Sequence, residues 1–161
     1  MQIKSTIQHA DGPVRDLVYV DIDRTEELGG RNVQAAHAYC FCNGKLVLVH
    51  HTSHGWQPPG GGTEEGEITE ETVAREVQEE TNMRVLSQRL LGLQDIYNPD
   101  GMITQTRSVC LVEPIGEFEK DPDGDITEIK LIDPKDYKQY FDWGEVGDHI
   151  MRRALEISKQ L

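Results

Sequence analysis

Three glutamates, Glu76, Glu79 and Glu80, stand close together in the run REVQEE. On a helix, at about 100° per residue, their carboxylates share one arc beside an apolar side, so they repel one another. Nearby burial strengthens the repulsion because the dielectric falls. A divalent cation would reverse it, since Mg²⁺, with Mn²⁺ as a substitute, prefers oxygen ligands and usually takes substrate phosphates too. The spacing predicts metal-assisted attack of water on a phosphoanhydride.

Glycines and an arginine accompany these acids. Gly60, Gly61 and Gly62 allow a sharp turn and a close approach of the backbone to a metal ion or a phosphate. Arg75 is within helical reach of Glu71 and Glu79, and its guanidinium can hold a carboxylate with two hydrogen bonds. We therefore expect the glycine loop and the following helix to form one catalytic site.

The spacing of these residues resembles the signature of the Nudix family, also called MutT-like hydrolases. That signature is Gly, five residues, Glu, seven residues, Arg-Glu, an aliphatic, any residue, Glu-Glu, any residue, Gly and an aliphatic. The chain departs from it at Asn82, but Asn also accepts the left-handed conformation that Gly adopts. The lead-in at residues 56–60, WQPPG, is also similar to the family's. Within the motif at 61–83, the matching positions are Gly61, Glu67, Arg75, Glu76, Val77, Glu79, Glu80 and Met83.

The resemblance implies a role for each matching residue. The three glutamates would be the metal-binding carboxylates, and Gly60 would add its carbonyl oxygen as a ligand. Glu67 would brace the junction of loop and helix by bonding Arg75. Family members often recruit one more acid from a late loop, and whether that acid or a motif glutamate is the general base stays open. The candidates for the extra acid are Asp125 and Glu128, followed by Glu113, Glu117 and Glu119.

Other residues are candidates for substrate contacts. Gly61 and Gly62 are placed to approach phosphates, and Asp125 and Glu128 are included because of their late position. Trp56 can stack on a base, although packing at a strand end explains this residue equally well. Three further possible contacts, with no motif to support them, are Tyr97, Arg31 and Arg107.

Two alternative metal sites are weaker interpretations. Three histidines within residues 50–54 suggest zinc, but no further ligand pattern supports it, and ordinary polar residues at a strand end are the better explanation. The acidic segment 121–125 suggests calcium. It departs from the EF-hand pattern, because Gly124 falls two positions early and Ile132 occupies the place of the final Glu. A solvated loop is the better interpretation of that segment.

The sequence also predicts the helix that must hold the motif. It runs from about Glu67 to Thr81, because acids suit a helix N-terminus and Asn82 can form a left-handed cap at its end. At helical spacing, one side of this helix should face the core. That side consists of Val73, Ala74, Val77 and Thr81.

Strands surround the helix in the sequence. Runs rich in apolar and β-branched residues alternate with turn signals such as Asn43–Gly44, which favours a hairpin. Turns or loops are expected at residues 24–31 and 116–125. Strands are expected at residues 14–23, 33–42, 45–51, 84–97, 102–113 and 126–132, with a short helix from Pro134 and a longer one over 145–159.

These elements predict a single domain spanning residues 1–161. Its class is α/β (α+β), and the resemblance implies the Nudix fold, with a mixed β-sheet sandwiched between α-helices. Residues 1–23 either extend the sheet or mediate a dimer, so both a monomer and a homodimer are open. Cys40, Cys42 and Cys110 match neither a zinc site nor a redox pair, and we expect buried free thiols.

Composition restricts the partners and the compartment. The 161 residues are 37% apolar and 28% charged, which is typical of a globular domain, and the formal net charge of −13 repels nucleic-acid polymers. A small anionic substrate is compatible with that charge if a bound cation neutralises it. No apolar run approaches the roughly 20 residues of a membrane span, and Met1–Asp11 lacks the regions of a secretory signal. We therefore expect a cytoplasmic protein that is not bound to a membrane.

Together, these observations predict a metal-dependent pyrophosphohydrolase. It would cleave a phosphoanhydride bond in a nucleoside diphosphate linked to another moiety, such as a nucleoside triphosphate or ADP-ribose. One alternative is a catalytically silent Nudix-like module that binds a nucleotide, and another is a calcium-binding acidic protein. The identity of the substrate and the phosphorus that is attacked stay open, because pocket walls come from scattered strands and loops.

Overall fold

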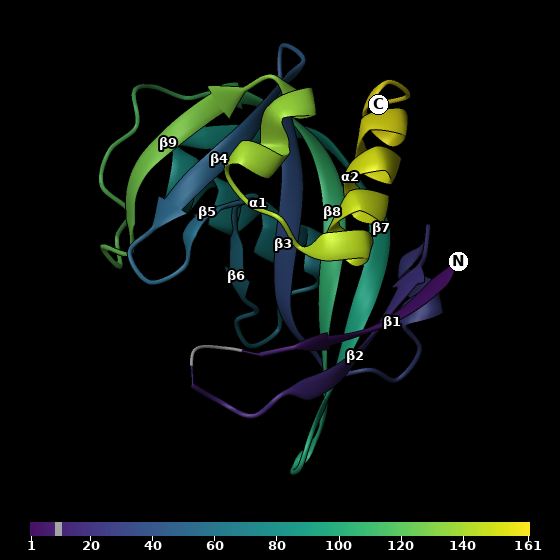
Figure 1. Cartoon of the computed structure of the whole chain (residues 1–161). Helices are drawn as coiled ribbons and strands as arrows, with labels where there is room; N and C mark the ends of the chain where they lie inside the picture. The colour runs from purple at the N-terminus through teal and green to yellow at the C-terminus, as the bar shows by residue number, and fades with distance from the viewer. Residues whose placement is uncertain (9–10) are drawn as a thin grey trace.

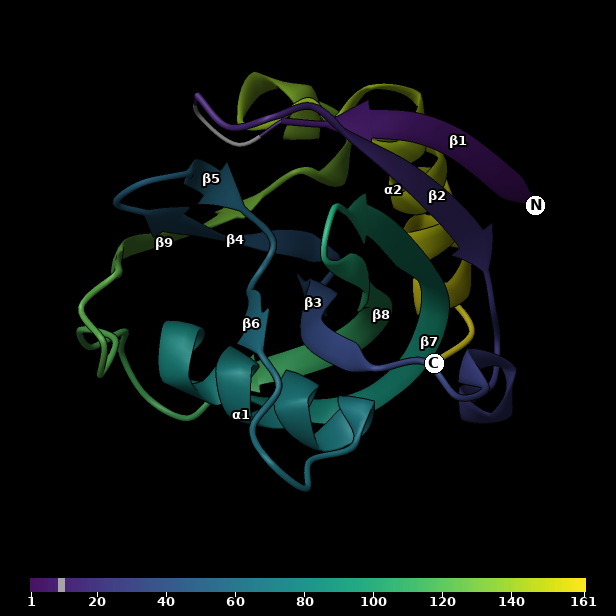
Figure 2. The ribbon, with the colours of Figure 1, turned by 90° about the horizontal axis from the view of Figure 1, so that it is seen from below.

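A large mixed β-sheet crosses the centre of the molecule, and one long helix covers each of its faces (Figures 1 and 2). The computed structural model describes residues 1–8 and 11–161; residues 9–10, within the N-terminal segment whose role was open, lie outside the described residues. The helices are α1 (Thr69–Thr81) and α2 (Gly144–Ser158), with short 3₁₀ helices η1 (Thr25–Leu28) and η2 (Pro134–Gln139). The strands are β1 (Gln2–Ile7), β2 (Arg15–Asp21), β3 (Val33–Cys42), β4 (Lys45–His51), β5 (Gly55–Gln57), β6 (Gly60–Gly62), β7 (Met83–Asn98), β8 (Gly101–Pro114) and β9 (Ile126–Ile132).

The strand order is β1-β2-β7-β8-β3-β4-β5, while β6 also pairs with β3 and β9 with β4. Neighbouring strands are antiparallel except for β3 and β8, which are parallel. This mixed sheet between two helices confirms the predicted fold class. Strand β1 pairs with β2 along its whole length, so the N-terminal segment extends the sheet.

Most predicted elements are confirmed within a few residues, and β3, β4 and β9 begin and end where the sequence indicated. The differences are local. The segment 24–31, expected to be a loop, contains η1. Strands β5 and β6 were not predicted, because three residues are too few to show an alternation and the glycines of β6 are rare in strands.

Two hydrophobic clusters hold the layers together. On the α2 side, large side chains such as Tyr39, Phe41 and Ile150 are fully or almost fully buried. On the α1 side the sheet presents small residues, including Ala36, Ala38 and Cys40, which let the helix lie close to the strands. All three cysteines are free and buried, as expected. Among the described residues, no helix is both long enough and apolar enough to cross a bilayer.

The orientation of α1 differs in one respect from the prediction. Val73, Val77 and Thr81 are buried against the sheet as expected, but Ala74 is exposed. The helix is rotated so that Thr72 and Glu80 face inward beside these apolar residues. Glu80 is therefore part of the buried side of α1, next to β6.

Candidate active site

Helix α1 is closed at both ends by local interactions. At its N-terminus the backbone N–H of Ile68 donates to Glu71 Oε1 (3.3 Å), so Glu71 serves as a cap and not as a partner of Arg75. At its C-terminus Asn82 adopts the predicted left-handed conformation (φ 54°, ψ 37°), and its N–H donates to the carbonyl of Gln78 (2.9 Å). These caps position the acidic side chains of α1 against the glycine loop.

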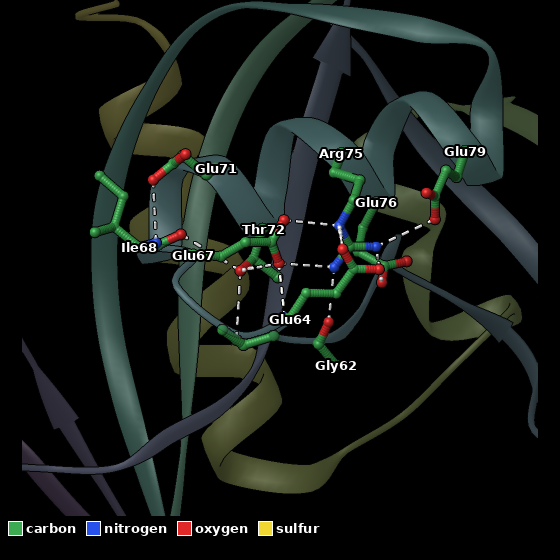
Figure 3. A network of polar contacts seen from close by, with 10 residues as sticks. Gly62, Glu64, Glu67, Ile68, Glu71, Thr72, Arg75, Glu76 and Glu79 are labelled. Atoms are coloured by element: carbon green, nitrogen blue, oxygen red, sulfur yellow. Dashed lines mark hydrogen bonds and ion pairs between the residues drawn. The ribbon is translucent and has the colours of Figure 1, made fainter.

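Arg75 connects the loop to the helix, as Figure 3 shows. Its Nε donates to Glu67 Oε2 (2.7 Å), while Nη2 donates to Glu67 Oε1 (2.9 Å) and to the carbonyl of Gly62 (2.8 Å). Its Nη1 donates to Glu76 Oε1 (2.9 Å) and Glu79 Oε2 (3.2 Å). The hydrogen bond from Arg75 lowers the pKa of Glu67 to about 2. The bracing contact between Glu67 and Arg75 is thus present in the structure.

Glu76 and Glu80 are brought together on the inner side of α1, where both line a cavity. Glu80 is 6% exposed, and its Oε2 is buried without a hydrogen-bond partner among the described residues. Burial, followed by the charge of Glu76, raises the pKa of Glu80 to about 9. Burial also raises the pKa of Glu76, although its hydrogen bond with Arg75 opposes this.

Glu79 lies beside the other two acids but does not line the cavity: its Oε2 shares the Arg75 Nη1 donor with Glu76 Oε1. It is held by Arg75 and lines a separate shallow groove with Ala74 and Gln78. Of the three predicted acids, Glu76 and Glu80 line the cavity, and Glu79 lines the neighbouring groove.

Close contacts with neighbouring atoms require glycine at residues 60 and 61. A Cβ on Gly61 would lie 2.6 Å from Glu76 Oε1, and a Cβ on Gly60 would collide with the carbonyl of Ala36 and with His37. All three glycines of β6 line the cavity beside Glu76 and Glu80. Any side chain at Gly60 or Gly61 would displace the acids or separate β6 from β3.

The late acidic loop contributes a residue that the sequence interpretation missed. Asp121 is 6% exposed and lines the cavity, and its Oδ2 accepts hydrogen bonds from the N–H groups of Asp125 (3.2 Å) and Ile126 (3.4 Å). The available signal was its position ahead of Pro-Asp-Gly, where an aspartate commonly bonds the backbone of its own turn. Asp125 also lines the cavity, whereas Glu128 is exposed on β9 opposite His50.

The remaining candidates for the late acid are also placed by the structure. Glu113 is half-buried and pairs with Arg84 (2.9 Å). Glu117 accepts a hydrogen bond from the Asn82 side chain through its backbone carbonyl (2.7 Å), and Glu119 borders the groove that holds Glu79.

The cavity has a volume of about 810 Å³, within the size range of small-molecule sites. The acids lie at one end of it, and the N-terminal segment and α2 form walls elsewhere. Trp56 lines it as well, and its ring packs perpendicular to that of Tyr140, with 5.9 Å between centroids. Arg31 is engaged with Asp95 (3.1 Å), and Tyr97 is exposed on the β7–β8 hairpin, while Arg107 lines the cavity.

The donor set fits Mg²⁺ better than zinc or calcium. Among the described residues, no group of three or more His, Cys, Asp or Glu side chains is arranged to hold a metal ion alone. This leaves the zinc and calcium interpretations without structural support. Mg²⁺ usually takes one or two carboxylates and completes its shell with water and phosphate oxygens. The unpartnered Oε2 of Glu80, beside Glu76, suits that pattern.

The fold and the site together define an α/β protein with an acidic cavity beside a glycine loop. The model of the NUDIX domain matches residues 31–154, which is more than half of the chain and includes the glycine loop and α1. The chain belongs to the NUDIX family.

Three known proteins show the extent of the similarity. The chain is 37% identical over 71 residues to "Putative 8-oxo-dGTP diphosphatase YtkD" of Bacillus subtilis (strain 168), and the alignment covers 43% of the chain and 45% of that relative. The chain thus spans less than half the length of that relative. A mutant of the B. subtilis pyrophosphohydrolase BsRppH has a similar structure, with a TM-score of 0.71, 21% identity and coverage of 94% and 96% of the two chains. The NUDIX domain of Shewanella oneidensis NrtR, solved with ADP ribose, has a TM-score of 0.61, 18% identity and coverage of 83% and 92%.

Proposed function

We propose that the chain is a metal-dependent hydrolase that cleaves a phosphoanhydride bond in a nucleoside diphosphate linked to another moiety, such as a nucleoside triphosphate or ADP-ribose. The observation that carries the proposal is the buried Glu80 carboxyl, which has an unpartnered oxygen and lies beside Glu76 and Asp121. Burying several acids together is unfavourable unless a cation compensates them. The printed names of YtkD and BsRppH, a diphosphatase and a pyrophosphohydrolase, support the same chemistry.

Glu80 and Glu76 would hold Mg²⁺, or Mn²⁺ in its place, with the carbonyl of Gly60 as a further ligand. When bound, such an ion neutralises phosphate charge and lowers the pKa of the attacking water. The compact glycines of β6 let phosphates approach the backbone closely, since no side chain intervenes. Arg75 keeps Glu67 and Glu76 in place through its five hydrogen bonds, four of which are to carboxylates.

Asp121 and Asp125 place additional carboxylates at the acidic end of the cavity. Either of them, or a motif glutamate, is a candidate to accept the proton of the attacking water. Asp121 is the better positioned of the two late acids, because it is buried and held by two backbone N–H groups. These two hydrogen bonds fix the orientation of the carboxylate at the cavity wall.

The competing function is a silent module that binds a nucleotide without turnover. The intact acids and the Arg75 network favour an enzyme, because binding alone does not require a buried unpartnered carboxyl. The two functions differ in turnover, so product release separates them.

The test is release of phosphate or nucleotide from a panel of nucleoside triphosphates, ADP-ribose and nucleotide sugars with Mg²⁺ or Mn²⁺. We expect Glu80→Gln to lower kcat by at least about 100-fold, because a carboxylate ligand to the metal ion is lost. Glu71→Gln is the matched control, since Gln can also cap the helix and position 71 is outside the cavity. Wild-type turnover by Glu80→Gln would contradict the proposal. Nucleotide binding without product from the wild type would support the silent module.

A further inference from the structure

A buried arginine lies in the cavity on β8, without an acidic partner. Arg107 is 5% exposed, and its hydrogen bonds are to neutral groups. Nη1 contacts His37 Nδ1 (3.3 Å) and donates to the carbonyl of Thr106 (3.0 Å), while Nη2 donates to Gln105 Oε1 (3.2 Å). Among the described residues no carboxylate forms an ion pair with it, and its Nε has no partner. A guanidinium has five N–H donors, and three of them are used here. The other two are the buried Nε–H and one N–H of Nη2.

Such an arrangement is unfavourable in the free protein. A buried charge is ordinarily paired, because transfer out of water costs free energy that neutral acceptors restore only in part. A guanidinium stays charged in proteins and presents its donors as a rigid planar fork. Arg107 is therefore prepared to bind a ligand group that presents hydrogen-bond acceptors in one plane.

Two amides extend this planar set. Gln94 on β7 and Gln105 on β8 are directly opposite each other in the sheet, and Gln105 lies on the same face as Arg107, two residues away. Both glutamines line the cavity. Gln94 is 5% exposed, and its side-chain amide forms no hydrogen bond with another described residue. Unlike the guanidinium, each amide offers both donors and acceptors.

Apolar side chains contribute to the same cavity. Leu17 on β2 and Val146 on α2 line the same cavity, together with the ring of Trp143. The acids lie at the other end. In the sheet, Gly60 is opposite His37 and His37 is opposite Arg107, so two inter-strand steps, roughly 10 Å, separate the glycine loop from Arg107. One nucleotide can therefore place its phosphates at the acids and its base at the three planar side chains.

We infer that Arg107, with Gln94 and Gln105, binds the base of the substrate and selects purines with an oxo group at position 6, such as guanine and hypoxanthine. An arginine only donates, so it matches the adjacent O6 and N7 acceptors of guanine, whereas adenine presents an amino group at that edge. A phosphate presents acceptors alone, whereas a planar base can use both the donors and the acceptors of the two amides. The inference rests on the proposed function, since it assumes a nucleotide substrate.

Equilibrium binding tests this inference without turnover. GMP, IMP and AMP are titrated calorimetrically into the wild type, Arg107→Met and Arg107→Lys in the presence of Mg²⁺. We expect the wild type to prefer GMP and IMP to AMP, and Arg107→Met to reduce that preference by about 10- to 100-fold with little change in AMP affinity. Arg107→Lys keeps the charge but loses the fork, so it should also lose most of the preference. Arg84→Met, which removes an exposed arginine on β7, is the matched control.

The outcomes separate the two proposals. Equal weakening of GMP, AMP and inorganic pyrophosphate by Arg107→Met, with Arg107→Lys retaining affinity, would assign Arg107 to phosphate and overturn the inference. A wild type without preference for GMP over AMP would overturn it too. If Arg107→Met does not fold by circular dichroism, Arg107→Lys decides. A GMP preference that depends on Arg107, in a protein that hydrolyses no nucleotide, would support the inference and contradict the proposed function.

Discussion

Glu80 is the residue at which burial and charge conflict most directly. In the metal-free protein its pKa is raised to about 9, by burial and then by Glu76, compared with an ordinary value of 4.5. Between these two values the folded protein keeps a proton that the unfolded chain releases. The contribution of Glu80 to the free energy of unfolding therefore falls as pH rises from about 4.5 to 9, and it is highest where both states are protonated.

Replacing Glu80 by Gln should remove this pH-dependent loss. In EDTA we expect Glu80→Gln to melt at a higher temperature than the wild type at pH 8, with a difference that disappears near pH 4. Mg²⁺ should then raise the Tm of the wild type and leave that of the variant almost unchanged, because only the wild type binds the ion at Glu80. Differential scanning fluorimetry across this pH range measures both effects. Parallel melting profiles at every pH would show that Glu80 is not strained.

Asn82 is a single residue that links the end of α1 to the segment after β8. Asn82 ends α1 in the left-handed conformation where the Nudix signature has Gly. Its side chain also forms a hydrogen bond that Gly could not form. The Nδ2 donates to the carbonyl of Glu117 (2.7 Å), and the carbonyl of Asn82 accepts from the N–H of Ile115 (2.9 Å). These bonds attach the end of α1 to the segment that leads from β8 to Asp121. The asparagine thus connects the two acidic parts of the site.

At the scale of helix α1, Asn82→Ala and Asn82→Gly should lower the free energy of unfolding by different amounts. Alanine loses the side-chain hydrogen bond and is also strained at positive φ, so we expect a loss of about 2–3 kcal/mol in the free energy of unfolding. Glycine accepts this φ and should lose only about 1 kcal/mol. Urea unfolding of both variants measures the difference. Equal losses would mean that the left-handed conformation contributes no strain at residue 82.

On the scale of the whole molecule, the net charge of −13 opposes an anionic substrate. Within the part of the chain that the structure describes, Arg107 is the one arginine or lysine that lines the cavity, whereas several acids line it. Long-range electrostatics therefore repel a nucleotide until it meets a metal ion at the site. This long-range repulsion is the opposite of the attraction in enzymes whose basic surface draws phosphates toward the site.

Salt should consequently assist the reaction. With Mg²⁺ kept saturating, we expect kcat/KM to rise a few-fold as NaCl is raised from about 10 to about 150 mM, since the Debye length falls from roughly 30 to 8 Å. The effect should be confined to KM, because charges within the cavity are screened less than charges on the surface. Initial rates at several salt concentrations measure it. A fall of kcat/KM with salt would show that local attraction by the site outweighs the net charge.

Local sequence patterns were sufficient to predict most helices and strands and the chemistry of the motif. Strand β3 and the left-handed cap at Asn82 follow from residue types and spacing over a few positions, which act before any tertiary contact forms. The proximity of Glu76 to Glu80 follows from helical geometry in the same way. The contact of Arg75 with Glu67 was implied by the family resemblance, and the structure contains it.

The tertiary structure decided what depends on neighbours distant in sequence. The rotation of α1 buries Glu80, exposes Ala74 and leaves Glu79 outside the cavity, because the helix packs on small residues of β3 that helical periodicity does not reveal. Asp121 joins the site through the path of a loop, and Arg107 enters the cavity because β8 pairs with both β7 and β3. The sequence by itself determined which carboxylates are available, through short-range spacing. Only the packing of the layers decided which of them share one desolvated cavity, since burial is a property of the whole fold.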